Sequence, residues 1–158
     1  MRMLIVTGGT GGHIYPAIAL ADAAKKRYQN IEILFVGNDD RMEATEIPAH
    51  GYAFKGLHAS GLTGNVFRKL KALALMANCY RKTFSILKEF QPDIVIGFGG
   101  YVSAPVMLAA HAKHIPTMIH EQIRLSVFAN KAVADKWMPS LFAMKNALRN
   151  SNERKHAY

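Results

Sequence analysis

Residues 7–16 read TGGTGGHIYP and directly follow the apolar residues 3–6, MLIV. The four glycines and one histidine stand between a segment typical of a buried strand and a segment with helical spacing. Glycines at such a junction let backbone N–H groups approach a partner without a Cβ atom in the way, and the N-terminus of a helix adds partial positive charge. Pro16 suits the first turn of a helix, so we expect the helix to start there. The stretch predicts a phosphate-binding loop; the alternative is a tight turn with no ligand.

A second glycine-rich stretch, GFGGYVSAP at residues 97–105, repeats the pattern after the expected strand at 93–96, DIVI. Ser103 and Pro105 are typical of another helix start. Glycine loops at the carboxyl ends of two parallel strands face the same crevice, which is where open α/β sheets bind ligands. We therefore expect the two loops to hold two phosphates or one pyrophosphate between them.

The whole chain alternates between strand-like and helical segments. Strands are expected near 3–7, 33–36, 52–57, 93–98 and 116–120, and helices near 16–28, 41–47, 65–90, 103–114 and 126–136. Short apolar strands that alternate with helices predict a doubly wound, Rossmann-like α/β domain with a parallel sheet. We expect residues 1–149 to form this domain and residues 150–158 to be a polar tail or the start of a linker.

The charge of the chain is uneven. Of its 158 residues, the first 50 carry five Lys or Arg and six Asp or Glu, whereas the rest carry fifteen and five, for a net charge of +9. The second part is expected to attract phosphate, nucleic acid or anionic lipid. Charge alone supports nucleic acid, and no recognised nucleic-acid module is present, so we expect no nucleic-acid partner. The single cysteine, Cys79, and the absence of an apolar run of about 18 residues favour the cytoplasm.

The expected long helix at 65–90 carries an apolar stripe at steps of three and four residues, which predicts the face packed on the sheet. The stripe consists of Val66, Leu70, Leu73, Ala77, Tyr80, Phe84 and Leu87. A second set near the start of this helix mixes apolar and basic side chains, which predicts contact with an anionic membrane or, alternatively, an ordinary basic surface. Its members are Leu62, Phe67, Arg68, Lys69 and Lys71.

Two common phosphate motifs fit the first loop poorly. A P-loop would end in Gly-Lys-Ser/Thr, but His13 and Ile14 stand there. A dinucleotide motif that starts at Gly9 has Ile14 in place of its third glycine, although Asp39 stands where a ribose-binding acid is expected. A nucleotide- or NAD-binding module that acts through a partner protein therefore remains the alternative function.

Six ordered motifs resemble the N-terminal, acceptor-binding half of the MurG family of glycosyltransferases. They are GGTGGHIYPAIALA from Gly8, GNDDRMEATEIPAHG from Gly37, SGLTG from Ser60, PDIVIGFGGYVSAP from Pro92, IPTMIHEQ from Ile115 and ANKAVAD from Ala129. The resemblance implies a GT-B hexosyltransferase of two Rossmann-like domains that needs no metal and no cofactor. It implies transfer of N-acetylglucosamine from UDP-N-acetylglucosamine to undecaprenyl-pyrophosphoryl-MurNAc-pentapeptide (lipid I) in peptidoglycan synthesis, at the cytoplasmic face of the cell membrane as a peripheral protein.

The resemblance also assigns roles to residues. His13 is implied to be the base that takes the proton from the acceptor's 4-hydroxyl; the alternative is a capping or phosphate-binding histidine. A histidine suits this role because imidazole takes up protons near neutral pH. The residues implied to contact the UDP-sugar are Thr10, Gly11 and Gly12, those implied at the lipid pyrophosphate are Gly99, Gly100 and Tyr101, and Glu121 and Gln122 are further substrate-binding candidates.

The chain departs from the family pattern in two places. After HEQ the family usually has Asn, which is assigned to donor contact, but Ile123 and Arg124 follow here. The chain also ends about where the donor-binding domain of the family would begin. We therefore expect the isolated chain to be inactive and a separate donor-domain subunit to be a possible partner. The remaining histidines show no metal-ligand spacing and are expected in loops or at the surface; they are His50, His58, His111, His114 and His156. His120, next to Glu121, is expected to be a strand-end residue with satisfied hydrogen bonds; the alternative is a catalytic role.

Overall fold

The computed structural model describes residues 1–61 and 65–120. In this part of the chain, strands and helices alternate as the sequence predicts. The strands are β1 (Arg2–Val6), β2 (Glu32–Asn38), β3 (Ala53–Leu57), β4 (Ile94–Gly97) and β5 (Thr117–Ile119), and the helices are α1 (Gly11–Arg27), α2 (Glu43–Ala49), α3 (Val66–Phe90) and α4 (Ser103–Ala112). The expected helix at 126–136, the tail at 150–158 and the domain boundary at 149 lie outside the described residues.

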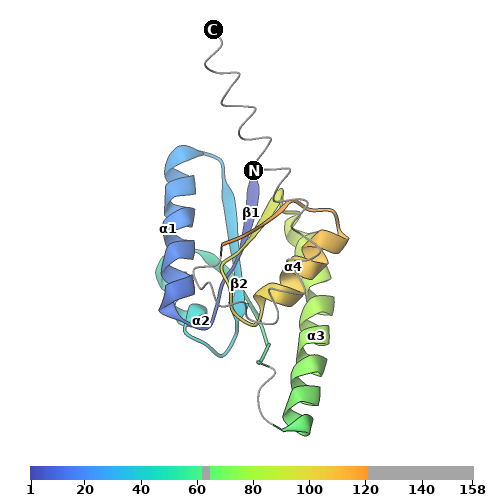
Figure 1. Ribbon diagram of the computed structural model, residues 1–158. Helices are drawn as coiled ribbons and strands as arrows, with labels where there is room; N and C mark the ends of the chain where they lie inside the picture. The colour runs from blue at the N-terminus through green and yellow to red at the C-terminus, as the bar shows by residue number, and fades with distance from the viewer. Residues whose placement is uncertain (62–64, 121–158) are drawn as a thin grey trace, which may run out of the picture. The chain divides into compact units, whose positions relative to one another are not determined.

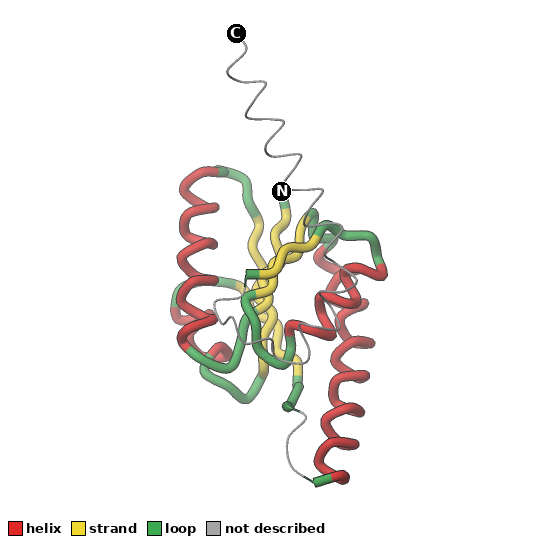
Figure 2. Tube along the Cα trace, in the orientation of Figure 1, coloured by secondary structure: helices red, strands yellow, loops and turns green. Residues whose placement is uncertain are grey.

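The five strands form one parallel sheet in the order β3-β2-β1-β4-β5. The order reverses direction between β1 and β4, where Val6 lies opposite Gly97. Figure 1 shows α1 and α2 on one side of the sheet and α3 and α4 on the other, and Figure 2 shows the strands between the two layers of helices. The prediction of a doubly wound parallel sheet is confirmed.

The centre of the sheet is buried on both faces because its central strands are apolar at nearly every position. Leu4, Ile5 and Val6 of β1 are fully buried although neighbouring side chains point to opposite faces. On the α1 side, Ile5 joins one cluster with Ile14 and Phe35. This core fixes where β1 and β4 end, and so where the two glycine loops begin.

Helix α1 starts five residues earlier than predicted. Thr10 has extended backbone, and Gly11, Gly12 and His13 form the first turn, so the prediction of a start at Pro16 is wrong. Pro16 lies inside α1 and cannot donate to the carbonyl of Gly12, but its fixed φ matches helical backbone. The two glycine pairs of the motif therefore differ in structure: Gly8 and Gly9 lie in the loop after β1, whereas Gly11 and Gly12 begin α1.

The predicted buried stripe of α3 is wrong in its first half. Val66 is 70% exposed, Leu70 58% and Leu73 52%, and Ala77 is also exposed. The buried residues are Ala72, Cys79, Thr83, Ile86 and Leu87. A helix of 25 residues is about 37 Å long, whereas strands of four to seven residues span about 13–23 Å. Helix α3 therefore extends past the sheet at its N-terminal end, as Figure 1 shows.

The second half of α3 packs firmly. Cys79 is 1% exposed, and burial raises the pKa of its thiol to about 11. Thr83 donates from Oγ1 to the carbonyl of Cys79, which satisfies the buried hydroxyl. Within the described residues, no helix combines the length and the apolar character needed to cross a bilayer.

Candidate functional site

The two glycine loops are in contact at the carboxyl ends of β1 and β4. A Cβ atom on Gly100 would lie 2.7 Å from the carbonyl oxygen of Gly8, and one on Gly99 would lie 2.9 Å from Nε2 of His13. Both residues also have positive φ, +95° at Gly99 and +89° at Gly100. Glycine is needed at both positions because the loops approach each other and because the backbone is left-handed. The prediction that the two loops lie side by side is confirmed.

His13 lies between the loops in the first turn of α1 and is half-buried. Its Nδ1 lies 2.9 Å from the carbonyl oxygen of Gly8 and 3.5 Å from Oγ1 of Thr10. A carbonyl can only accept, so Nδ1 carries the hydrogen in this contact. In the neutral ring the lone pair is then on Nε2, the nitrogen next to Gly99. This orientation is the one that a general base needs, and the catalytic role itself stays a prediction.

The residues that the resemblance assigns to the UDP-sugar lie at the start of α1. Thr10 and Gly12 are exposed, and Gly11 lies against the ring of Tyr15, where a Cβ atom would come within 3.0 Å of Cε2. The N–H group of His13 donates to the carbonyl of Thr10, and the positive end of the helix dipole at this turn attracts negative charge. The position suits an anionic group such as a phosphate, and contact with the UDP-sugar stays a prediction.

Tyr101 joins the second loop to a third segment. Its side chain is 52% exposed, and its ring lies on Gly61, where a Cβ atom would come within 2.6 Å of Cζ. Gly61 belongs to the SGLTG motif, whose position in the fold the sequence does not predict. Within the second loop, Ser103 donates from Oγ to the carbonyl of Gly99 at 2.5 Å. The predicted start of α4 at Ser103 is confirmed.

Sequence reasoning missed Glu43, the first residue of α2. Its side chain is fully buried, and its carboxylate accepts hydrogen bonds from the backbone N–H of Asn38 at 2.9 Å and of Gly9 at 3.2 Å. The sequence held one signal: Glu43 stands four residues before the buried Ile47, on the same face of a short helix. An acidic residue on an apolar face indicates a buried partner.

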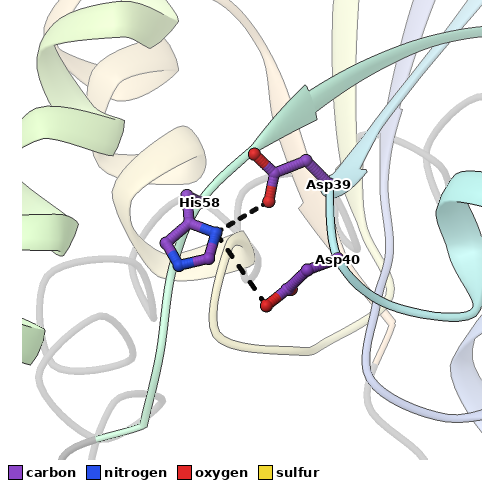
Figure 3. A group of neighbouring side chains, drawn as sticks. All are labelled: Asp39, Asp40 and His58. Carbon is purple, nitrogen blue, oxygen red and sulfur yellow. Dashed lines mark hydrogen bonds and ion pairs between the residues drawn. The ribbon is translucent and has the colours of Figure 1, made fainter.

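Three exposed side chains meet at the ends of β2 and β3 (Figure 3). Nδ1 of His58 lies 2.8 Å from Oδ1 of Asp39 and 3.9 Å from Oδ2 of Asp40. Their ligand-type atoms lie within 4.8 Å of one another. His58 is at the surface as expected, but its approach to Asp39 was not predicted, because Asp39 follows β2 and His58 follows β3. The ribose contact of Asp39 in the NAD alternative stays a prediction.

The other residues predicted to contact the membrane or a substrate are either exposed or outside the residues that the structure describes. Phe67 is 82% exposed, and Arg68, Lys69 and Lys71 are exposed beside it on the projecting end of α3. Leu62, Glu121, Gln122, Ile123 and Arg124 lie outside the described residues.

Comparison with known proteins gives consistent matches. Residues 3–138 match the glycosyltransferase family 28 N-terminal domain. Proteins named UDP-N-acetylglucosamine–N-acetylmuramyl-(pentapeptide) pyrophosphoryl-undecaprenol N-acetylglucosamine transferase are similar: the one from Christiangramia forsetii is 47% identical over 136 residues, and the one from Geobacter metallireducens 45% over 135. Each alignment covers 85% of this chain and 37% of the relative.

A solved structure agrees with these relatives. The crystal structure of Acinetobacter baumannii MurG matches with a TM-score of 0.72 and 30% identity, over 85% of this chain and 39% of that chain. The chain thus spans little more than a third of the length of the relatives that it matches. The chain belongs to glycosyltransferase family 28, and its described residues form part of that family's N-terminal domain.

Proposed function

We propose that this chain is the acceptor-binding part of a transferase that moves N-acetylglucosamine from UDP-N-acetylglucosamine to lipid I. The names of its relatives support this substrate pair. The observation that carries the proposal is the placement of His13, whose ring is oriented by Gly8 between two glycine loops. A nucleotide-binding module needs the loops but has no use for an oriented base.

In the proposed reaction, the 4-hydroxyl of the acceptor sugar attacks C1 of N-acetylglucosamine. The new bond forms from oxygen to C1, the bond from C1 to the UDP oxygen breaks, and the hydroxyl proton passes to Nε2 of His13. Gly8 accepts the hydrogen of Nδ1, so it holds the ring and stabilises the imidazolium that forms. The first turn of α1 and the loop at Gly99, Gly100 and Tyr101 supply N–H groups for the phosphates of the two substrates.

A chimera tests the proposal. The matching N-terminal part of the Christiangramia forsetii relative is replaced by this chain, and transfer of radiolabelled N-acetylglucosamine to a lipid I analogue is measured. We expect transfer by the chimera and none by the isolated chain, because positioning of both substrates supplies much of such a rate. A folded chimera that binds NAD and transfers no sugar would favour the dinucleotide-binding alternative.

We also propose that the projecting end of α3 binds the cytoplasmic face of the membrane, which keeps the chain close to a lipid-linked acceptor. Apolar and basic side chains are exposed together on this end: Val66, Phe67, Leu70 and Leu73 with Arg68, Lys69 and Lys71. Leu62 belongs to the same predicted contact. Exposed apolar side chains among lysines and arginines are typical of reversible attachment to anionic lipid.

Co-sedimentation with phosphatidylglycerol vesicles tests this contact. Each basic residue near an anionic surface contributes about 1 kcal/mol, so joint replacement of Arg68, Lys69 and Lys71 by Gln should weaken binding about 100-fold at low salt. The matched control replaces Lys25, Lys26 and Arg27 in the last turn of α1 by Gln, which makes the same change in net charge. Equal losses in the two triple variants would show that net charge, not the end of α3, causes binding.

A further inference from the structure

The buried carboxylate of Glu43 has no role in the reaction proposed above. Glu43 has no exposed surface, whereas Glu46, one turn later on α2, is half-buried. Burial of a carboxylate costs free energy unless hydrogen bonds satisfy it. A charged group in this position therefore indicates a function that an apolar side chain cannot perform.

Glu43 joins two segments that are far apart in the sequence. Its Oε2 accepts from the N–H of Gly9 in the first glycine loop, and its Oε1 accepts from the N–H of Asn38 at the end of β2. Hydrogen bonds to an ionised group are about twice as strong as neutral ones, so the carboxylate holds both backbone segments. The N–H of Gly9 is consequently directed to Glu43 and not to a phosphate.

Two glycines make the space for this carboxylate. A Cβ atom on Gly8 would overlap Oε1 of Glu43, and one on Gly37 would lie 2.6 Å from its Cγ. No positive φ requires glycine at either position. Gly8 is thus explained by the approach of Glu43, and Gly37 by Glu43 together with the carbonyl oxygen of Thr7, which would lie 2.8 Å from a Cβ atom on Gly37. Gly8 gives the opening motif a role besides ligand binding.

Asn38 connects Glu43 to a third segment, the one that contains Ala59 and Gly61. Its Nδ2 donates to the carbonyl of Ala59, and its Oδ1 accepts from the N–H of Ala59, both at 2.9 Å. Two residues later, Gly61 supports the ring of Tyr101. A set of contacts therefore runs from the first glycine loop through the buried side chains of Glu43 and Asn38 to the segment that touches Tyr101 of the second loop.

We propose that Glu43 is a positioning residue: it fixes the backbone of Gly8 and Gly9 so that the carbonyl of Gly8 holds His13 with its hydrogen on Nδ1. The catalytic consequence rests on the proposed function, because it needs His13 to act as the base. The effect of Glu43 on the backbone of Gly8 and Gly9 and on the tautomer of His13 does not depend on that function. It can be measured in the isolated chain without substrate.

The test uses nitrogen-15 NMR of the 158-residue chain. In Glu43→Gln, the side-chain amide can accept from only one of the two N–H groups. Amide exchange at Gly9 or Asn38 should therefore rise about 10–100-fold, the scale of a hydrogen bond to a charged group, and the share of the Nδ1–H tautomer of His13 should fall. The matched control, Glu46→Gln, should change neither signal.

A second variant displaces the carboxylate without removing its charge. In Gly8→Ala, the new Cβ meets Oε1 of Glu43, so the same two signals should change in the same direction. If Glu43→Gln and Gly8→Ala both fold and His13 keeps the tautomer of the parent chain in both, the proposal is overturned. Loss of folding in both would also overturn it, since Glu43 would then be a requirement for folding and not for position.

A turnover measurement in the chimera separates this proposal from the proposed function. Glu43→Gln should lower kcat for sugar transfer about tenfold or more and leave KM for UDP-N-acetylglucosamine nearly unchanged, because a misplaced base affects the chemical step. An inactive parent chimera would count against the proposed function, and the NMR result would still decide the role of Glu43. If Glu43→Gln changes kcat more than it changes KM, and the tautomer of His13 also changes, the result supports both the proposed function and the positioning role of Glu43.

Discussion

The two glycine loops occupy equivalent places at the ends of neighbouring strands, but they are stabilised differently. The first loop depends on a distant residue, because Glu43 accepts from the N–H of Gly9 across 34 positions of sequence. The second loop is held from within, since Ser103 donates to the carbonyl of Gly99 four residues before it. Both φ values of Gly99 and Gly100 are positive, whereas the first loop has only Gly9 in that region.

The difference corresponds to what each loop carries. The first loop orients a ring nitrogen of His13, and a group that must be aligned with a reacting atom needs support from several elements. The second loop presents backbone and the exposed Tyr101, which suits contact with a phosphate more than proton transfer. The predictions below test this division between a loop for chemistry and a loop for binding.

The largest effect is expected at His13. In the chimera, His13→Ala should lower kcat by about 10²–10⁴-fold, the usual scale for loss of a general base, with little change in thermal stability. The matched variant in the second loop, Tyr101→Phe, should mainly raise KM for the lipid acceptor. If both variants change kcat and KM in the same proportion, the two loops do not divide chemistry and binding.

The next effect concerns the contact between the loops. Gly100→Ala adds backbone strain and a Cβ atom 2.7 Å from the carbonyl oxygen of Gly8, so it should lower the free energy of unfolding by about 2–6 kcal/mol. Gly9→Ala has a similar φ, +91°, but open space around the new Cβ, so only the strain of about 1–3 kcal/mol should remain. Denaturant unfolding of both variants measures the difference. Equal losses would mean that the loops do not press on each other.

The smallest effect is expected from local stabilisation of the second loop. Ser103→Ala removes the hydrogen bond to Gly99 and should cost about 0.5–1.5 kcal/mol of stability. Because the bond lies within the second loop, the tautomer of His13 should stay as in the parent. A change of that tautomer would show that the second loop also positions the base.

Much of the fold followed from the sequence. Apolar runs such as residues 3–6 and 33–36 predicted strands that are buried on both faces, and their alternation with helices predicted the parallel sheet. The sequence predicts too late a start for α1 because Pro16 is a strong local signal, while Gly11 and Gly12 before it already belong to the helix. The predicted apolar stripe of α3 is wrong in its first half because periodicity shows which residues share a face of the helix and not whether the sheet reaches them.

Local sequence patterns are sufficient to predict the units of strand, glycine loop and helix and to locate His13 at the entrance of the first helix. These are local properties, set by apolar periodicity and by the backbone freedom of glycine. The groups that approach these glycines depend on how the chain folds: Glu43 lies at Gly8 and Gly37, His13 at Gly99, and the carbonyl of Gly8 at Gly100. The reason is that strand order brings β1, β2 and β4 together, and contacts between their ends join residues that no local pattern relates.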